Sequence, residues 1–419
     1  MRALHASLQF HSGGAARAAR RICEAQVLQG IDVSILSAVR SENPLTRVTS
    51  YEVDLLRGRI QGKLERAVLA GLRLKDGNVR SLGLLPSSVP KSVNQIKPDV
   101  LNLHWVGRSF LAGWQVSRID APSVWTLHDL WPASGALHYP ASAWTMDASE
   151  AAHFFASQRS MRSRVLESAL RRVKERTMRN VSFVAPTKWL ADEVATRLNR
   201  GSCRVHQIPI AVPTHVFSPG NIDQARASLN MPTDRPVVGF ASATNSRYAL
   251  KGAHFLPSIM ARVRQRVPDA LLVTLDKSRE RGSESGSGTA TSTLGLSFID
   301  SDHDLAQFYR SCDVVVVPSI LDNFNQVAAE ALACGTPVVA FDNSGLATVI
   351  QDEQTGLLAR AFDTHEFGDL VAELILDAKL HSLLSREARM RAVESWAYPV
   401  VASAYERFYG QLLTHSSAS

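Results

Sequence analysis

Two carboxylates, Asp322 and Glu330, flank the start of a short predicted helix in the second half of the chain. The apolar run at residues 314–317 precedes them and is typical of a buried parallel strand. Gly335 and then Pro337 follow the helix, and this order is a common helix-end signal. Open amides at a helix start suit phosphate or hydroxyl oxygens, and the acids suit sugar hydroxyls. The segment therefore predicts a ligand site at the carboxyl end of a parallel strand.

A candidate cation for a phosphate group, Lys251, stands beside Gly252 at the start of another predicted helix. A predicted strand at residues 236–241 and a polar loop at residues 242–248 precede it. Negative charge develops on the phosphate when a sugar–phosphate bond breaks, so cations and helix-end amides must lie there. A surface lysine near a turn is the alternative interpretation.

Gly13 and Gly14, between the first predicted strand and the first predicted helix, form a second candidate phosphate site. Glycine permits close approach of the backbone, and the helix dipole favours an anion. A Gly-Gly pair by itself also marks many ordinary turns.

Polar side chains also follow two predicted strands in the first half of the chain. His128 comes after the buried strand at residues 124–127, where it can hydrogen-bond a sugar hydroxyl, and Asp129 orients it or binds the acceptor. A histidine that caps the following helix is the alternative. His104 and Trp105 end the preceding predicted strand. We expect them to line the side of the site that binds an acceptor for the sugar, with core packing as the alternative for both.

One pattern has the spacing of a divalent-metal site, namely Asp302-His303-Asp304. The two acids stand directly before a helical run, where cap and first-turn acids are common. We therefore predict no metal site.

The composition indicates an ordinary soluble globular protein. The 419 residues exceed the usual size of one domain, so two domains are expected. No apolar run is long enough to span a membrane, and the N-terminus lacks the apolar core of a signal peptide. The four cysteines are scattered, which favours buried thiols in a reducing cytoplasm over a zinc site.

Basic residues cluster in two amphipathic segments, at residues 57–75 and 159–179. The second has apolar residues at helical spacing between its basic ones. Such helices suit an anionic membrane surface or a diphosphate-linked lipid acceptor, and a solvated charged face is the alternative. No nucleic-acid motif accompanies the charge, so we expect no nucleic-acid partner.

Strands and helices alternate along both halves of the chain, which predicts two doubly wound α/β domains with parallel sheets. Pro209 and Pro213 mark a break, and residues 217–220 resemble an interdomain linker. The boundary is therefore placed between residues 217 and 218. Residues 282–293 are rich in Gly and Ser and are predicted to form a mobile loop. The last predicted helix covers residues 392–413.

The stretch after residue 322 resembles the nucleotide-sugar-binding motif of retaining glycosyltransferases with two Rossmann-like domains, the GT-B fold, and of family 4 in particular. That motif is Glu-x7-Glu followed by Ala-x-Ala-Cys-Gly-x-Pro-Val-Val-Ala. The matching residues are Glu330, Ala331, Ala333, Cys334, Gly335, Pro337, Val338, Val339 and Ala340. In this family the second glutamate holds the ribose hydroxyls, which assigns that role to Glu330. Asp322 replaces the first glutamate and is one methylene shorter.

The resemblance also implies roles for the other candidates. Lys251 would contact the donor diphosphate, as would Gly13–Gly14, while Arg247 lies one residue from the position of the family's arginine. The backbone amides of Asn323, Phe324 and Asn325 would join Asp322 in holding the hydroxyls of the transferred sugar. Residues 218–394 would bind the nucleotide sugar. Residues 1–217 would lie on the acceptor side, face the second domain across a cleft and receive a C-terminal helix at residues 395–415.

The string that continues from His128, Ser134-Gly135-Ala136-Leu137-His138-Tyr139, is similar to one in colanic acid and exopolysaccharide transferases. These resemblances imply a cytoplasmic transferase, peripheral on the inner face of the membrane, in bacterial surface polysaccharide synthesis. Its donor would be linked to UDP or GDP, its acceptor a glycan or lipid-linked saccharide, and it would need no cofactor. We predict transfer with retention by front-face substitution, with Lys251, His128 and Asp322 as the catalytic residues.

Two other functions fit the same pattern. A sugar-nucleotide 2-epimerase has the same two-domain architecture and needs no acceptor. A catalytically weak nucleotide- or carbohydrate-binding protein would explain Asp322 in place of glutamate.

Overall fold

The computed structural model describes two compact units, unit 1 (residues 1–210 and 401–419) and unit 2 (residues 211–400). The described residues are 1–11, 13–38, 48–52, 55–74, 79–108, 110–140, 158, 160–198, 205–242, 249–276, 292–297 and 299–416, with the backbone alone at 55–59, 249, 276, 415 and 416.

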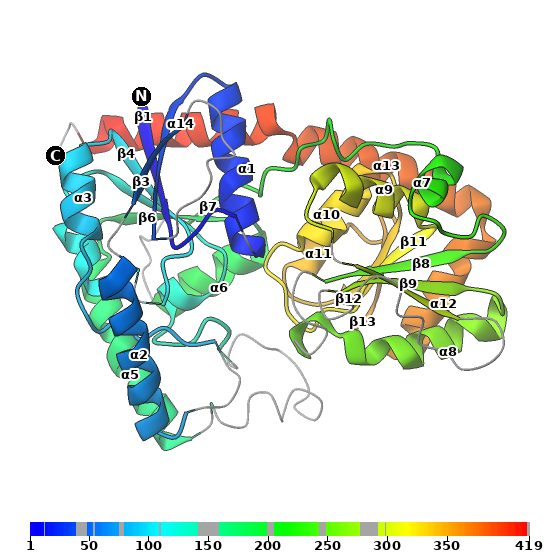
Figure 1. The fold of residues 1–419 in the computed structure, drawn as a ribbon, viewed down its shortest axis with the longest axis horizontal. Helices are drawn as coiled ribbons and strands as arrows, with labels where there is room; N and C mark the ends of the chain where they lie inside the picture. The colour runs from blue at the N-terminus through cyan, green and yellow to red at the C-terminus, as the bar shows by residue number, and fades with distance from the viewer. Residues whose placement is uncertain are drawn as a thin grey trace. The chain divides into compact units, whose positions relative to one another are not determined.

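Unit 1 contains, within its described residues, a seven-stranded parallel sheet in the order β3-β2-β1-β4-β5-β6-β7 (Figure 1). The strands are β1 (Arg2–Ser7), β2 (Asp32–Ser37), β3 (Thr49–Glu52), β4 (Val100–Leu103), β5 (Ser123–Thr126), β6 (Val181–Ala185) and β7 (Val205–Gln207). The helices are α1 (Gly14–Leu28), α2 (Leu55–Gly71), α3 (Val89–Ile96), η1 (Gly113–Arg118), η2 (Trp131–Ala133), α5 (Met161–Thr177) and α6 (Lys188–Leu198). The central strands β4 and β5 are buried along their whole length, because helices cover both faces of such sheets.

Unit 2 contains, in its described part, a six-stranded parallel sheet in the order β10-β9-β8-β11-β12-β13. The strands are β8 (Val237–Ala241), β9 (Leu271–Asp276), β10 (Thr293–Ser297), β11 (Val314–Val317), β12 (Val338–Asp342) and β13 (Leu357–Arg360). The helices are α7 (Ile222–Ser228), η5 (Ala249–Lys251), η6 (Ala253–Phe255), α8 (Leu256–Arg266), α9 (Asp302–Ser311), α10 (Gln326–Ala333), α11 (Leu346–Val349), α12 (Thr364–Leu376) and α13 (Ala378–Trp396).

The strand order reverses once in each sheet, between β1 and β4 in unit 1 and between β8 and β11 in unit 2. At such a reversal the connections leave toward opposite sides, so the loops after the two central strands diverge. Ligands of doubly wound folds bind there, beyond the carboxyl ends of the strands. The loops after these four strands are therefore the first places to look for a site.

The predicted fold class is confirmed, and its parts differ in detail. The structure adds β3 and β13, which the sequence analysis did not predict, and β10 begins inside the segment predicted as a loop. The predicted last helix at residues 392–413 is wrong as a single helix. It is broken at Ala397, which has extended backbone angles (φ −57°, ψ 147°), between α13 and α14 (Tyr398–Ser416). Pro399 explains the break, because its ring is tolerated only in the first turn of a helix.

Residues 401–416 of α14 belong to unit 1, although they follow unit 2 in the sequence (Figure 1). The side chains of Tyr405 and Tyr409 are fully buried in unit 1. The Tyr409 hydroxyl accepts hydrogen bonds from Asn102 Nδ2 (2.7 Å) and Gln26 Nε2 (3.3 Å). Thus the C-terminal helix joins the first domain through buried polar contacts.

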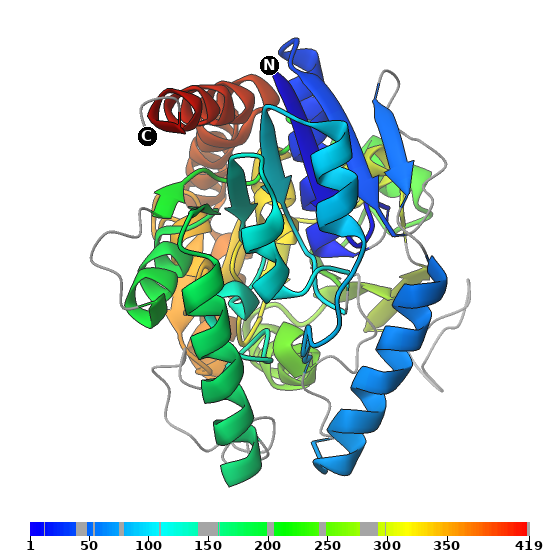
Figure 2. The same ribbon diagram turned by 90° about the vertical axis from the view of Figure 1, so that its left-hand side faces the viewer.

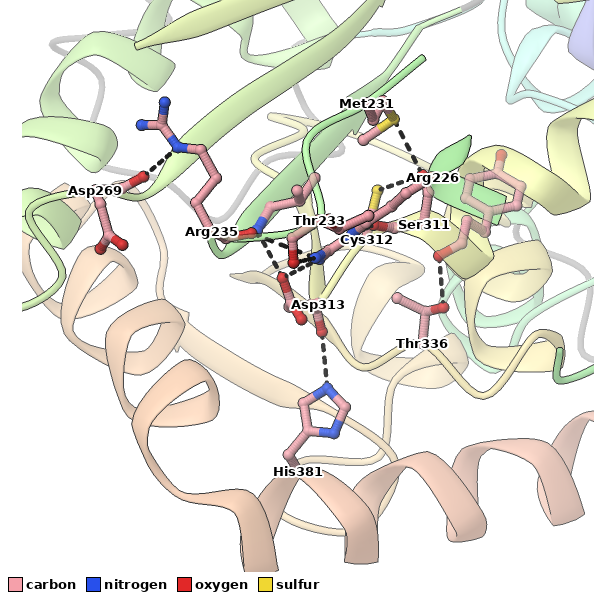
Figure 3. Close-up of polar contacts among 12 residues, drawn as sticks. Arg226, Met231, Thr233, Arg235, Asp269, Ser311, Cys312, Asp313, Thr336 and His381 are labelled. Atoms are coloured by element: carbon pink, nitrogen blue, oxygen red, sulfur yellow. Dashed lines mark hydrogen bonds and ion pairs between the residues drawn. The ribbon is translucent and has the colours of Figure 1, made fainter. Parts of the chain in front are cut away.

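A charged cluster ties the amino ends of β8 and β11 to two helices of unit 2 (Figure 3). Arg226 of α7 donates to Asp313 Oδ2 (2.7 Å) and to the Ser311 carbonyl (3.0 Å). The amide of Val237 donates to the same Asp313 oxygen (2.6 Å), and His381 of α13 hydrogen-bonds the Asp313 carbonyl (2.9 Å). This cluster fixes the register of the two central strands at the edge opposite their ligand-facing ends.

Helices α2 and α5 have inverted polarity, with polar residues turned inward and apolar residues turned outward. In α2, Glu65 accepts from the Leu82 and Gly83 amides and Gln61 donates to the Pro86 carbonyl (2.6 Å). On the outward side, 58% of Ile60 is exposed, and Leu64 is exposed as well.

In α5, Glu167 accepts from the amides of Gly135, Ala136 and Leu137, while 70% of Met161 and 60% of Val165 are exposed. Both helices extend in the same direction from unit 1 (Figure 2). The predicted basic segments are therefore helical at residues 57–71 and 161–177, but the apolar faces of these helices do not pack into the core. No helix in the described part of the chain combines the length and hydropathy of a bilayer-spanning segment.

Candidate functional site

Lys251 and Asp322 form an ion pair at the point where the strand order of unit 2 reverses. Lys251 ends η5, after β8, and Asp322 lies in the loop after β11. Lys251 Nζ lies 2.7 Å from Asp322 Oδ2, and both side chains are only partly buried. The structure thus brings together the predicted phosphate cation and the predicted sugar-binding carboxylate, which stand 71 residues apart in the sequence.

Asn325 connects this ion pair to the start of α10. Its Nδ2 donates to Asp322 Oδ2 (2.7 Å), while its Oδ1 accepts from the amide of Ala328 (2.8 Å) as the helix N-cap. An asparagine cap satisfies an otherwise unpaired amide of the first helical turn. One residue therefore both starts the helix and orients the carboxylate.

Two glycines hold the loops of this site close together. Gly252 has φ +71°, and a Cβ there would collide with the Pro318 carbonyl at the end of β11. The Gly345 amide donates to the Asp322 carbonyl (2.8 Å), and a Cβ at Gly345 would collide with the Asn323 carbonyl. The Ile320 amide also donates to the Leu250 carbonyl (2.8 Å). These contacts place Lys251 against the Asp322 loop.

Glu330 occupies a different environment from Asp322. It lies within α10 with 1% of its surface exposed, and its Oε2 accepts from the Tyr309 hydroxyl (2.6 Å). The predicted contact with ribose hydroxyls stays a prediction, and the structure adds a buried tyrosine that shares this carboxylate.

The other predicted donor residues lie around the same loop. Asn323 and Phe324 are buried, and the Phe324 ring packs edge-on against Trp396 with the ring centroids 5.9 Å apart. Their predicted contact with the transferred sugar through backbone amides stays a prediction. Arg247 lies outside the described residues.

In unit 1, Gly13 and Gly14 stand at the start of α1, directly after the loop that follows β1. Gly13 is the N-cap with φ +90° and ψ 159°, a conformation that L side chains rarely adopt. The first turn of α1 contains no acidic residue, so nothing acidic there opposes an anion.

His128 is the last of three histidines in hydrogen-bonded order. His5 Nδ1 lies 2.9 Å from His104 Nε2, and His104 Nδ1 lies 3.1 Å from His128 Nε2. His128 is half-buried, whereas 1% of His104 is exposed. His104 is therefore packed in the core between two other rings, which is the alternative that the sequence left open. It is connected to the more exposed end of the row only through His128.

Burial makes the charged form of these rings unfavourable, since the interior solvates charge poorly. It lowers the pKa of His5 and of His128 to about 4 and holds the pKa of His104 well below its usual range. The row is neutral at physiological pH, so it offers hydrogen bonds rather than charge.

Asp129 pairs with a histidine other than His128. Its Oδ2 lies 2.6 Å from His138 Nδ1 and accepts from Trp105 Nε1 (2.8 Å), while its Oδ1 accepts from the Trp131 amide (2.9 Å). Burial alone would raise the pKa of Asp129, but His138 and the donors outweigh it and lower that pKa. Asp129 thereby fixes Trp105, which is half-buried, and its predicted role toward the acceptor stays a prediction.

The same cluster has the order of a Ser-His-Asp triad, since Ser81 Oγ lies 2.9 Å from His138 Nε2. Ser81 has no exposed surface, and its Oγ accepts from the Arg108 amide (2.9 Å). A nucleophile needs access to its substrate, so this triad positions the loop that carries Asp129.

Asp302 and Asp304 lie in the first turn of α9, as the sequence analysis predicts for first-turn acids, but the cap is Ser301, whose Oγ accepts from the Asp304 amide (3.3 Å). Among the described residues, no group of three or more His, Cys, Asp or Glu could hold a metal ion.

Several residues of the site were not singled out from the sequence, namely His5, Gln26, Tyr309, Gly345 and Tyr409. His5 carries a visible signal, because it is a polar residue inside a run that otherwise forms a buried strand. The partners of Glu330 and Gln26 come from distant elements, and no local pattern identifies them.

The comparisons with known proteins divide the chain close to the boundary between the two units. Residues 12–216 match the family Glycosyltransferase Family 4, and residues 221–391 match the family Glycosyl transferases group 1. The chain consists of two glycosyltransferase domains. The Lys251–Asp322 pair and Glu330 lie in the group 1 domain. The histidine row, which ends at His128, lies in the family 4 domain.

Curated relatives match this chain in part. The D-inositol 3-phosphate glycosyltransferase of Mycobacteroides abscessus is 32% identical over 226 residues, which are 50% of this chain and 48% of that protein. That of Mycolicibacterium smegmatis is 31% identical over 232 residues, or 52% of this chain and 50% of that protein. The chain spans about half the length of these relatives.

Solved structures resemble the whole chain. Sucrose-phosphate synthase from Thermosynechococcus elongatus superimposes with a TM-score of 0.70 at 19% identity over 99% of both chains. Anabaena HepE in complex with UDP-glucose gives a TM-score of 0.67 at 16% identity over 98% of this chain and all of that one. At these identities the likeness establishes the fold, two Rossmann-like domains of the GT-B class.

Proposed function

We propose that this protein is a glycosyltransferase that moves a sugar from a nucleotide-diphosphate-sugar donor to an acceptor hydroxyl. The observation that carries the proposal is the Lys251–Asp322 ion pair (2.7 Å), at the strand-order reversal of the group 1 domain. It offers a cation for a phosphate and a carboxylate for sugar hydroxyls at the edge where such folds bind ligands. The UDP-glucose in the HepE structure supports UDP as the donor nucleotide, with GDP as the alternative.

In this proposal Lys251 exchanges its contact with Asp322 for the donor phosphates and stabilises the charge that develops as the leaving group departs. Asp322, held by Asn325, then accepts from a hydroxyl of the transferred sugar. Glu330 holds the ribose, and the start of α1 at Gly13–Gly14 contacts the diphosphate. His128 hydrogen-bonds a hydroxyl of the bound sugar.

We further propose retention by front-face substitution, without a metal ion or a cofactor. The bond between the anomeric carbon and the phosphate oxygen breaks, and the acceptor oxygen bonds to that carbon on the same face. The acceptor proton passes to the leaving phosphate oxygen. No enzyme nucleophile is required, so this scheme needs only positioning and electrostatic stabilisation.

Two acceptor classes follow from different observations. The similarity to D-inositol 3-phosphate glycosyltransferases supports an inositol phosphate acceptor. The motif around His128 favours a glycan or lipid-linked saccharide in surface polysaccharide synthesis.

A direct experiment is to incubate the protein with UDP- and GDP-sugars, each with inositol 3-phosphate or a lipid-linked saccharide, and to analyse products by mass spectrometry and NMR. Transfer with the donor's anomeric configuration supports the proposal, and an inverted product contradicts retention. Conversion of a donor without acceptor into its 2-epimer identifies the epimerase instead. Binding without either reaction identifies the binding protein.

We also propose that unit 1 docks on an anionic membrane surface through α2 and α5, on the cytoplasmic side. The exposed apolar residues Ile60 and Leu64 lie one turn apart, with Lys63 and Arg66 exposed beside them. On α5, Met161 and Val165 are flanked by exposed arginines, namely Arg162, Arg164, Arg171, Arg172 and Arg176. Apolar residues ringed by cations suit the boundary between acyl chains and anionic headgroups.

Liposome co-sedimentation tests this docking. Vesicles with anionic lipid are expected to bind the protein, neutral vesicles to bind it weakly, and Ile60→Gln with Leu64→Gln to weaken binding. Leu28→Gln is the matched control, because Leu28 is an exposed leucine on α1. Equal binding to both vesicle types, or equal loss in the control, contradicts the proposal.

A further inference from the structure

The loop that follows β12, Asn343-Ser344-Gly345, holds the backbone of Asp322 on both sides of its Cα. The Asp322 amide donates to Ser344 Oγ (3.1 Å), and the Gly345 amide donates to the Asp322 carbonyl (2.8 Å). These two groups belong to the two planar peptide units that flank Asp322. Fixing both planes fixes the direction in which the Asp322 side chain leaves the backbone.

The Ser344 hydroxyl has a second partner in the same loop. The Ser319 carbonyl can only accept, so Asn343 Nδ2 donates to it (3.1 Å), and Asn343 Oδ1 accepts from Ser344 Oγ (2.9 Å). The hydroxyl proton is used in this contact, which leaves a lone pair for the Asp322 amide. The contact with Asp322 holds for either orientation of the Asn343 amide, because a backbone N–H can only donate.

Ser344 adopts a backbone conformation that favours glycine. Its φ is +49°, in the left-handed region, which costs an L-residue about 1–2 kcal/mol and glycine almost nothing. The next residue, Gly345, has φ −71°, which suits any residue, but a Cβ there would collide with the Asn323 carbonyl. Glycine at position 344 would relieve the strain but would lack the hydroxyl. Strain of this kind occurs where the surrounding structure maintains a geometry that function needs.

The carboxylate of Asp322 is held by a separate set of contacts. Its Oδ2 lies 2.7 Å from both Lys251 Nζ and Asn325 Nδ2. In the proposed function Lys251 moves to the donor phosphates, so the carboxylate loses one of these two contacts. The backbone contacts with Ser344 and Gly345 do not involve Lys251, and they remain when it moves.

We propose that Ser344 is a positioning residue, which keeps the Asp322 carboxylate oriented toward a hydroxyl of the transferred sugar after Lys251 has moved to the donor phosphates. It acts through the Asp322 amide, so its effect is confined to the sugar part of the donor. The role toward the sugar rests on the proposed function. The contact with the Asp322 amide rests on the structure alone.

Amide hydrogen exchange without any ligand tests that contact. Ser344→Ala and Ser344→Gly both remove the hydroxyl, and the Asp322 amide should exchange about three- to tenfold faster in each, as for the loss of one hydrogen bond. The Val315 amide, which donates to the Pro337 carbonyl within the sheet, reports global unfolding. Exchange at Asp322 that is unchanged relative to Val315 in both variants would overturn the proposal.

The same two variants separate the hydroxyl from the backbone strain. Alanine keeps the strained φ and glycine relieves it, so Ser344→Gly should unfold at a higher temperature than Ser344→Ala. Glu353→Gly is the matched control, because Glu353 is exposed in the same unit with φ +57°. It should gain stability in the same way without any change in ligand affinity.

Calorimetric titration with UDP and UDP-glucose tests the role toward the sugar. Both Ser344 variants should bind UDP within about twofold of the wild-type Kd and UDP-glucose about three- to tenfold more weakly, the equivalent of one weakened hydrogen bond. An affinity that follows stability, with Ser344→Gly equal to wild type, would make Ser344 a structural residue. Equal weakening of UDP and UDP-glucose would also contradict the positioning role.

The two readouts separate this inference from the proposed function. GDP and GDP-mannose are titrated in parallel for the alternative nucleotide. A wild-type protein that binds none of the four ligands contradicts the proposed function, and the sugar role of Ser344 with it. Hydrogen exchange at Asp322 needs no ligand, so it still decides whether Ser344 holds the Asp322 amide.

Discussion

The two strand-order reversals of this molecule are lined by opposite kinds of chemistry. In unit 1 a row of three histidines, the buried His5 and His104 and the half-buried His128, leads to the carboxyl edge, and burial disfavours their charged form. In unit 2 the corresponding edge carries an ion pair between Lys251 and Asp322, with both side chains in partial contact with solvent. The same topology therefore supports a neutral hydrogen-bonding edge in one domain and a charged edge in the other.

The difference follows from what covers each edge. In unit 1 the rings of His5, Phe10 and His128 pack around His104, and an isolated charge there would be costly. In unit 2 the loops after β8 and β11 leave Lys251 about one-third exposed, where a charge remains solvated until a ligand replaces the water. A neutral edge suits hydroxyl groups and a charged edge suits phosphate groups, which is the division a glycosyltransferase needs.

The largest expected effect comes from removing the charge of the unit 2 edge. Lys251→Ala should reduce kcat by about 100-fold or more, because it removes a cation that stabilises the leaving phosphate. Lys379→Ala is the control, since Lys379 is an exposed lysine in the same unit. Steady-state kinetics with the best donor measures both. Unchanged turnover in Lys251→Ala would remove this lysine from the mechanism.

The neutral histidines of unit 1 should make the free energy of unfolding depend on pH. His5 and His128 have pKa values near 4 when folded and about 6.5 when unfolded, so unfolding takes up protons between these values. The free energy of unfolding should therefore fall as the pH drops from 6.5 to 4, by up to about 1.4 kcal/mol per pH unit for each ring, and less for the half-buried His128.

Urea unfolding followed by tryptophan fluorescence checks this slope, because every tryptophan except Trp396 lies in the unit 1 sequence. His5→Asn should make the slope shallower. His303→Gln should not, because His303 is exposed on α9. A stability that is flat between pH 4 and 6.5 would mean that the edge of unit 1 is not neutral.

A smaller effect separates the two carboxylates of unit 2. Tyr309→Phe removes the donor to the buried Glu330 and should cost about 2 kcal/mol of unfolding free energy, with the donor KM nearly unchanged. Glu330→Gln should raise the donor KM instead, if the carboxylate holds the ribose. Thermal unfolding and donor titration decide this, and a Glu330→Gln variant altered only in stability would make Glu330 a structural residue.

The smallest change tests the departure from the family motif. Asp322→Glu adds one methylene to a carboxylate that already lies 2.7 Å from both Lys251 Nζ and Asn325 Nδ2. We expect a drop of about two- to fivefold in kcat/KM, comparable to a weakened hydrogen bond. An increase in activity would mean that aspartate weakens the hold on the sugar in this chain. The comparison across several donor sugars shows whether the position selects among them.

The sequence predicted those parts of the site that local pattern controls. Lys251 and Asp322 were each placed after an apolar strand, and parallel pairing of β8 with β11 then brings their loops together. The histidine row could not be predicted in the same way. His5 lies within β1, and His104 and His128 follow β4 and β5, so only the register of these three strands places the rings in line.

Helices α2 and α5 show a feature that helical periodicity alone does not predict. Their spacing predicts one apolar and one basic face, and the usual assumption places the apolar face in the core. In the structure Glu65 and Glu167 point inward instead, because backbone amides of the segments at Leu82–Gly83 and Gly135–Leu137 need acceptors. The need for these acceptors arises from a neighbouring loop, so it cannot be inferred from the spacing of residues within the helix.

The attachment of residues 401–416 to unit 1 has a consequence for synthesis of the chain. Domains usually fold in the order in which they leave the ribosome, yet Asn102 and Gln26 have no Tyr409 hydroxyl to bind until all of unit 2 has been made. Unit 2 can therefore finish folding before unit 1, although it is translated later. A nascent unit 1 must leave the surface that later buries Tyr405 and Tyr409 uncovered during that interval. This is the period in which the chain is most exposed to aggregation and most dependent on chaperones.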